Sequence, residues 1–187
     1  MLEEDYIAER RSLIDKTVAA PGMPDPGRPM GAAWNGDVAL QPTGPADEIS
    51  QLDTSYICVI DVDGTVFSAP PSDGSSGGPV VPGLGFVPST RGAQSSTDPS
   101  VPAVLAPGKR PRLTPNPAIA SRGTDWVMPF GSPGNDVQPQ AMAQVLLNLH
   151  QFGMAPQQAI DQPRFATFSY PRSSDPHSYS PGLLNHE

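Results

Sequence analysis

The chain has 187 residues, and its 25 prolines and 18 glycines make it rich in loops, whereas aromatic residues account for only 6%. A chain of this length has room for at most one hydrophobic core. Its formal net charge is -8, and its 11 Lys and Arg residues are scattered among 19 acidic residues. Because phosphate binding needs clustered positive charge, we expect no nucleic-acid partner.

Other classes of protein are also disfavoured. No run approaches the ~18 apolar residues of a membrane span, and the acidic residues 1–5 do not resemble a signal peptide. The histidines His150, His177 and His186 are not spaced with a second His or Cys as metal ligands are. Cys58, the single cysteine, lies inside an apolar run, and we expect it to be buried. The sequence thus predicts no metal, no cofactor and no membrane segment.

The first quarter of the chain contains little that predicts regular structure. Residues 3–14 combine apolar residues with alternating charges, which predicts a short amphipathic helix ending near Asp15. Residues 20–51 are rich in proline and glycine, a composition typical of an extended linker.

A hydroxyl residue, Thr54, comes immediately before a run that predicts a β-hairpin. Residues 55–60 indicate a buried strand, residues 61–64 an Asp-Gly turn, and residues 65–69 a second strand. Residues 70–78 are a loop rich in proline, serine and glycine. If the Asp53–Thr54 bond were cut, the new α-amine of Thr54, with a reference pKa near ~8, would be able to take the proton of its own hydroxyl. One residue would then supply both the nucleophile and the base.

The second half of the chain predicts a hairpin followed by helices. Residues 87–117 form a long irregular stretch, in which Lys109, Arg110 and Arg112 indicate a solvated cationic loop. Residues 118–120 and 126–130 indicate a second hairpin, and a glycine turn, residues 131–136, leads into a helix over 137–152. We expect Asp136 to cap the start of this helix and Gly153 to end it. Residues 157–162 predict a short helix, and the Pro/Ser-rich remainder predicts irregular structure.

Five motifs occur in an order that resembles the small-subunit region of the γ-glutamyltransferases (glutathione hydrolases), which are N-terminal nucleophile hydrolases. They are Thr54-Ser55-Tyr56 with Val59-Ile60-Asp61, Pro79-Val80-Val81-Pro82-Gly83-Leu84-Gly85-Phe86, Ala106-Pro107-Gly108-Lys109-Arg110-Pro111, Gly131-Ser132-Pro133-Gly134, and residues 152–165. The resemblance implies an α+β fold that is part of a four-layer αββα sandwich. Residues 1–53 then correspond to the tail of the large subunit, and residues 54–187 to a small-subunit catalytic region that is truncated at its C-terminal end.

The same resemblance implies a mechanism and assigns catalytic residues. Thr54 attacks the carbonyl of Asp53, which cleaves the chain, and the freed Thr54 then attacks a γ-glutamyl amide such as glutathione. The family's Pro-Gly-Gly oxyanion donors correspond to Pro133, Gly134 and Asn135. Asn135 replaces the second glycine, and asparagine is the residue besides glycine that best tolerates positive φ.

Substrate-binding positions follow from the resemblance too, with departures from the family. In the family, a threonine and an asparagine of this segment help to hold the nucleophile and the substrate, and Ser72 aligns with one or the other of them. Gln94, with Arg91 close by, replaces the acid that binds the substrate's α-ammonium. Leu113 and Thr114 replace a pair of serines that bind its α-carboxylate. A carboxylate-binding arginine belongs to the large-subunit portion of the precursor, which is the expected partner, and the family suggests a periplasmic or extracellular location.

Three functions are consistent with these observations. The first is γ-glutamyl transfer or hydrolysis. The second is an amidase or acylase of the same superfamily for another acyl group, which Gln94 and Leu113 favour because they alter the expected substrate contacts. The third is a non-catalytic fragment with disordered Pro-rich tracts.

Overall fold

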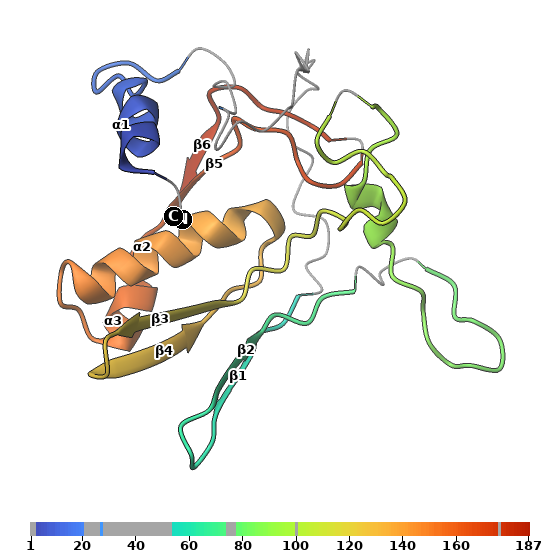
Figure 1. Ribbon diagram of the computed structural model, residues 1–187, viewed down its shortest axis with the longest axis horizontal. Helices are drawn as coiled ribbons and strands as arrows, with labels where there is room; N and C mark the ends of the chain where they lie inside the picture. The colour runs from blue at the N-terminus through green and yellow to red at the C-terminus, as the bar shows by residue number, and fades with distance from the viewer. Residues whose placement is uncertain (1–2, 21–26, 28–53, 74–77, 100, 176) are drawn as a thin grey trace.

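The computed structural model describes residues 3–20, 27, 54–73, 78–99, 101–175 and 177–187 (Figure 1). These residues form α-helices and separate two-stranded antiparallel sheets, so the α+β prediction is confirmed. The predicted N-terminal helix is α1, Glu4–Ser12. The predicted linker, residues 20–51, lies almost wholly outside the described residues. Within the described part of the chain, no helix combines the length and apolar character that a membrane crossing requires.

The predicted hairpin after Thr54 is present. Strands β1, Ile57–Ile60, and β2, Val66–Ala69, pair antiparallel, and Ile60 lies opposite Val66 next to the turn. The carboxylate of Asp61 accepts the backbone N–H groups of Asp63 and Thr65 at 2.9 and 2.8 Å, and its bonds with Thr65 are the main reason that its pKa is lowered. This side chain therefore fixes the turn in the predicted place.

The prediction that β1 is a buried strand was wrong. All four of its residues are exposed, including Cys58, which had been expected in a core. The hairpin projects from the rest of the described chain (Figure 1), so pairing with β2 satisfies the backbone without covering either face. A β-branched run predicts the strand because it suits a pleated backbone, but it does not by itself supply a covering layer.

The second hairpin is joined to the helix after it by a stack of two rings. Strands β3, Ala118–Arg122, and β4, Trp126–Phe130, pair antiparallel as predicted. Helix α2, Gln138–His150, lies alongside them, and the ring of His150 stacks on Trp126 with 4.5 Å between the ring centroids. The short predicted helix is α3, Pro156–Asp161, which packs on α2 through the buried Ala159.

The prediction that Asp136 caps α2 was wrong. A 3-10 turn, η3, Asn135–Val137, precedes the helix, and the N-cap residue of α2 is Val137, which makes no side-chain hydrogen bond. The carboxylate of Asp136 turns to the C-terminal segment and accepts the backbone N–H and the hydroxyl of Ser173. Gly153 lies beyond the last residue of α2, with a φ of 66°. Its left-handed backbone suits the end of a helix, as predicted.

The C-terminal segment is more regular than predicted. Strands β5, Phe165–Thr167, and β6, Leu184–His186, form a third hairpin. Two glutamines of α2 hold β5 in place: Gln144 exchanges two hydrogen bonds with the backbone of Phe165, and Gln140 does the same with Thr167. Side-chain amides thus extend the hydrogen bonding of this short strand, which a Pro/Ser-rich composition does not reveal.

We expect Gln140→Ala to destabilise the protein. The substitution removes bonds of 2.9 and 3.1 Å to Thr167 and one of 2.8 Å to the hydroxyl of Tyr170, all partly buried. The free energy of unfolding should fall by about 1–3 kcal/mol, because partners inside the protein lose their hydrogen bonds. Urea unfolding followed by circular dichroism measures this change.

The matched control is Gln158→Ala, since Gln158 is exposed and makes no side-chain hydrogen bond to the described residues. Its effect should stay within about 0.5 kcal/mol. Equal stability of the two variants would show that the glutamine contacts do not hold β5.

Candidate active site

The hairpin pairing places Thr54 beside Ser72, although 18 residues separate them. Beyond the paired strands β1 and β2, the backbone N–H of Ser55 donates to the carbonyl of Pro71 at 3.0 Å. The hydroxyl oxygens of Thr54 and Ser72 are then 2.7 Å apart, a hydrogen-bond distance, and both residues are half-buried. The nucleophile predicted from the sequence therefore has a hydroxyl partner.

Arg91 joins this pair to a second segment. Its Nε donates to the carbonyl of Ser72 at 2.7 Å, one terminal nitrogen donates to the hydroxyl of Ser72, and the other donates to the hydroxyl of Thr114 at 2.9 Å. Charge-assisted bonds of this kind are stronger than neutral ones. The guanidinium therefore crosslinks the loop of Ser72 to the segment of Thr114.

Gln94 completes the cluster as a buried residue that is only 2% exposed. Its amide nitrogen donates to the hydroxyl of Thr114 at 3.1 Å, and its amide oxygen accepts the backbone N–H of Thr114 at 3.3 Å. Arg91 and Gln94 are the first and last residues of the 3-10 turn η2, Arg91–Gln94, so their side chains point to the same side. The sequence analysis did not assign Arg91 to the site, although its spacing of three residues from Gln94 was a signal that could have done so.

The structure thus brings together four of the residues predicted from the sequence and adds Arg91. One hydrogen-bonded cluster, which we call the threonine cluster, consists of Thr54, Ser72, Arg91, Gln94 and Thr114. Leu113, the neighbour of Thr114, is 53% exposed. Asp53, on the other side of the expected cleavage site, lies outside the described residues.

The expected oxyanion loop, residues 131–135, has the backbone of a sharp turn. Gly134 has a φ of 128° and Asn135 a φ of 49°, so both occupy the positive-φ region that suits these two residue types. Asparagine therefore takes the conformation expected for the family's second glycine.

The loop is nevertheless supported by a residue that the sequence did not indicate. Gln138 is 1% exposed, and with its amide oriented to satisfy both polar atoms it donates to the carbonyl of Ser132 at 3.1 Å and accepts the N–H of Asn135 at 3.2 Å. One of the two expected oxyanion donors thus has a protein acceptor in this structure. Only the folded turn brings Gln138 back onto the loop that precedes it.

A close contact ties this loop to the strand that follows Thr54. A Cβ added to Gly131 would lie 2.4 Å from two ring carbons of Tyr56, so the ring packs directly on the glycine backbone. The hydroxyl of Tyr56 is in turn 2.8 Å from that of Ser68 on β2. Glycine at this position allows the hairpin of the nucleophile to approach the loop at the end of β4.

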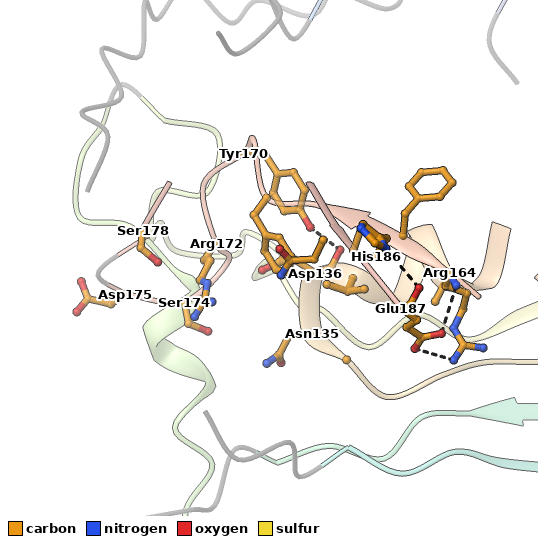
Figure 2. A pocket seen from close by; sticks show the side chains of 17 residues that line it. Asn135, Asp136, Arg164, Tyr170, Arg172, Ser174, Asp175, Ser178, His186 and Glu187 are labelled. Atoms are coloured by element: carbon orange, nitrogen blue, oxygen red, sulfur yellow. Dashed lines mark hydrogen bonds and ion pairs between the residues drawn. The ribbon is translucent and has the colours of Figure 1, made fainter. Parts of the chain in front are cut away.

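The loop also lines a pocket on its other side, with a volume of about 430 Å³ (Figure 2). The pocket lies between the start of α2 and the C-terminal segment, and Thr54 is not among its lining residues. The hydroxyl of Tyr170 donates to the carbonyl of Asp136 at 3.0 Å there, and burial, followed by the charge of Asp136, raises the pKa of this tyrosine. Gly134 and Asn135 therefore line a pocket whose surface is mostly apolar, while Gly131 of the same loop contacts Tyr56.

We expect Gly131→Ala to disturb the packing of Tyr56. Because its methyl group would overlap the ring, the free energy of unfolding should fall by about 1–3 kcal/mol. Gly92→Ala is the control, since nothing lies within 4 Å of its added Cβ and its backbone needs no positive φ. Thermal unfolding of both variants tests the contact, and an unchanged melting temperature for Gly131→Ala would contradict it.

Comparison with known proteins supports the assignment suggested by the motifs. The oxamate amidohydrolase proenzyme of Klebsiella pneumoniae subsp. pneumoniae is 42% identical over 88 residues, which are 47% of this chain and 17% of that protein. The glutathione hydrolase-like YwrD proenzyme of Bacillus subtilis is 34% identical over 115 residues, which are 60% of this chain and 22% of that protein. The chain thus spans about a fifth of the length of these curated relatives.

Solved structures give the same result over more of the chain. Two structures of LmbA2991 match 98% of this chain and 33% of their own, with TM-scores of 0.81 and 0.79 and identities of 34% and 33%. The gamma-glutamyltranspeptidase from Pseudomonas nitroreducens matches 61% of this chain and 65% of its own at a TM-score of 0.54 and 26% identity. A sequence model of the family described as gamma-glutamyltranspeptidase matches residues 1–181. The resemblance found in the motifs is confirmed, and the chain belongs to the gamma-glutamyltranspeptidase family.

Proposed function

We propose that this chain carries the nucleophile of a self-cleaving enzyme that opens amide bonds through an acyl-threonine intermediate. The observation that carries the proposal is the 2.7 Å contact between the hydroxyls of Thr54 and Ser72, inside a cluster braced by Arg91. A hydroxyl held by a neighbour in a fixed position is oriented for attack. The word proenzyme in the names of both curated relatives supports the processing step.

The first reaction is the cut before Thr54. Its Oγ1 attacks the carbonyl carbon of Asp53, the peptide nitrogen leaves, and the acyl group passes to the threonine oxygen as an ester. The departing nitrogen takes up the hydroxyl proton and becomes the free α-amine of Thr54. Water then hydrolyses the ester, which leaves a carboxylate on Asp53 and restores the hydroxyl of Thr54. This amine has a reference pKa near ~8 and serves as the base for the second reaction.

The second reaction acts on the substrate. Oγ1 of Thr54 attacks the amide carbon, the α-amine takes the hydroxyl proton, and the same proton passes to the leaving amine. Water or an acceptor amine then attacks the acyl-Thr54 ester and releases the acyl group. The residues that we assign to catalysis are Thr54, Gly134 and Asn135.

The backbone N–H groups of Gly134 and Asn135 would stabilise the oxyanion that forms at the attacked carbon. One such donor typically contributes roughly 3–4 kcal/mol to lowering the barrier. The packing of Tyr56 on Gly131 supports their approach to Thr54, because it links the two segments. For Asn135 to stabilise the oxyanion, its N–H must break its hydrogen bond to the side chain of Gln138. Gln138 therefore controls whether this donor is available.

The architecture follows the same family pattern. We propose that the described sheets and helices form part of an αββα sandwich, and that the exposed strand β1 packs within it. Residues 1–53 would be the tail of the large-subunit portion and residues 54–187 the small-subunit region. The solved structures that match 98% of this chain are three times as long, which supports a large-subunit portion of the precursor as the partner.

The first candidate substrate is a γ-glutamyl amide such as glutathione. Family membership supports it, and the name of the YwrD relative contains glutathione hydrolase. Ser72 and Thr114 supply hydroxyl donors for such a substrate, and Gln94 stands where the family has an acid.

A second candidate is an amide with a different acyl group. The amide of Gln94 carries no charge, it is buried, and both of its polar atoms bond Thr114, so it is poorly suited to bind an α-ammonium. The relative that is 42% identical is named for oxamate, whose acyl group has no ammonium. This observation favours an acyl donor other than γ-glutamyl.

The intact mass of the purified chain tests the proposal. We expect the wild type to yield two pieces split between residues 53 and 54, whereas Thr54→Ala should stay whole because it lacks the attacking hydroxyl. Thr124→Ala, which alters an exposed threonine in the turn between β3 and β4, should be cut like the wild type.

Release of amine from an amide substrate measures the second reaction. Thr54→Ala should lower the rate at least about a thousandfold, as loss of a catalytic nucleophile does. Cleavage of Thr54→Ala at the same bond would contradict the assignment of the nucleophile. A wild-type chain that remains whole and inactive would support the non-catalytic alternative.

A further inference from the structure

We infer that Arg91 selects the acyl donor by binding a carboxylate next to the nucleophile. The substrate class is therefore an amide whose acyl part carries a carboxylate close to the reacting carbonyl and carries no ammonium group. This inference rests on the proposed amide-cleaving function of Thr54.

The position of Arg91 is fixed by its own hydrogen bonds. Its Nε and one terminal nitrogen bind the carbonyl and hydroxyl of Ser72, and its other terminal nitrogen binds Thr114. A side chain held at three points loses little further freedom when it binds a ligand, and the planar guanidinium is the group best suited to a carboxylate. The cation is therefore preorganised.

Donor capacity remains for a ligand. An arginine side chain carries five N–H groups, of which three donate to Ser72 and Thr114 in the described structure. The two others belong to the terminal nitrogens, one on each. Arg91 is also only half-buried, so a small ligand can reach it.

The charge near Arg91 is not neutralised within the described residues. The two ion pairs found there join Arg112 to Asp136 and Arg164 to Glu187. Asp73, the neighbour of Ser72, is exposed and forms no ion pair with Arg91. A ligand carboxylate would pair with this cation, whereas an ammonium would be repelled and would find only the neutral, occupied amide of Gln94.

The chain of contacts also favours a short acyl group. Ser72 bridges Thr54 and Arg91, so two hydrogen bonds place the guanidinium no more than about 6 Å from Oγ1 of Thr54. A carbonyl under attack by Thr54 and a carboxylate on Arg91 must fit across that span. Monoamides of two- to four-carbon dicarboxylic acids do so, whereas three carbons separate the two groups in a γ-glutamyl chain.

The experiment uses three small amides of similar size that differ in charge. Malonamate carries a carboxylate, malonamide replaces it by a neutral amide, and 3-aminopropanamide carries an ammonium. Binding to the full chain is measured by isothermal titration calorimetry, and turnover is measured as ammonia release with the same amides and with glutamine. The variants are Arg91→Gln and Arg91→Lys, and the control is Arg110→Gln, which removes the same charge from an exposed position.

We expect the wild type to bind malonamate at least about tenfold more tightly than malonamide, because a charge-assisted bond replaces a neutral one. Arg91→Gln should abolish this preference, Arg91→Lys should keep part of it, and Arg110→Gln should leave it unchanged. In turnover, Arg91→Gln should raise KM for malonamate more than for the two other amides, beyond any fall in kcat that all three share through the lost bonds to Ser72. If Arg91 only positioned Ser72, kcat would fall for every amide alike.

The remaining outcomes separate this inference from the proposed function. Selective binding of malonamate without ammonia release would support Arg91 as a carboxylate site while contradicting the function proposed for Thr54. Turnover that prefers glutamine, or a carboxylate preference that survives in Arg91→Gln, would overturn the inference and leave the function standing. Absence of binding by the wild type would also overturn it. Circular dichroism shows whether each variant is folded. If Arg91→Gln is not folded, Arg91→Lys, which retains the charge, carries the test.

Discussion

The hydrogen bonds of Arg91 to Ser72 and Thr114 are the interaction on which the site depends. They join the loop after β2 directly to the irregular segment around residue 114, and neither of these segments belongs to a sheet or a helix. The guanidinium supplies several donors in a rigid plane, so one residue fixes two segments at once. The position of Thr54 relative to its neighbours follows from this crosslink and from the pairing of the hairpin.

Polar side chains carry out much of the packing that apolar residues perform in a larger domain. Gln94, Gln138 and Ser173 are almost completely buried, and each is hydrogen-bonded to a loop or a turn. Such buried amides and hydroxyls specify one geometry, because an unsatisfied polar atom in the same place would cost about 1–3 kcal/mol. In a chain with so many prolines and glycines, these contacts replace regular backbone pairing.

The same reliance on polar contacts connects structure to chemistry. The oxyanion loop is shaped by positive φ at Gly134 and Asn135, and Gln138 holds the N–H of Asn135. The threonine cluster has a cation but no carboxylate among its described members, so its electrostatic character differs from that of an ammonium-binding site. In the function that we propose, the reaction and the preference for an acyl group are therefore set by different residues.

The sequence predicted the elements that depend on local chemistry. A run of β-branched and aromatic residues that ends in an Asp-Gly turn predicted the hairpin after Thr54, and helical spacing predicted α2, because these signals act between near neighbours. The ordered motifs predicted the family, which the comparisons confirmed. They also selected Thr54, Ser72, Gln94 and Thr114, which the structure places in one cluster.

Tertiary structure alone decided the rest, since it depends on contacts between residues far apart in the chain. The exposure of β1 was mispredicted because periodicity predicts a strand but not what covers it. Asp136 was assigned to a helix cap, yet its carboxylate accepts hydrogen bonds from Ser173, 37 residues away. The hairpin of β5 and β6 depends on glutamines of α2, and the role of Arg91 depends on Ser72 and Thr114. The sequence by itself thus determined the family, the candidate nucleophile and the local elements, whereas folding decided which polar groups meet, because hydrogen-bond partners are fixed by position in space.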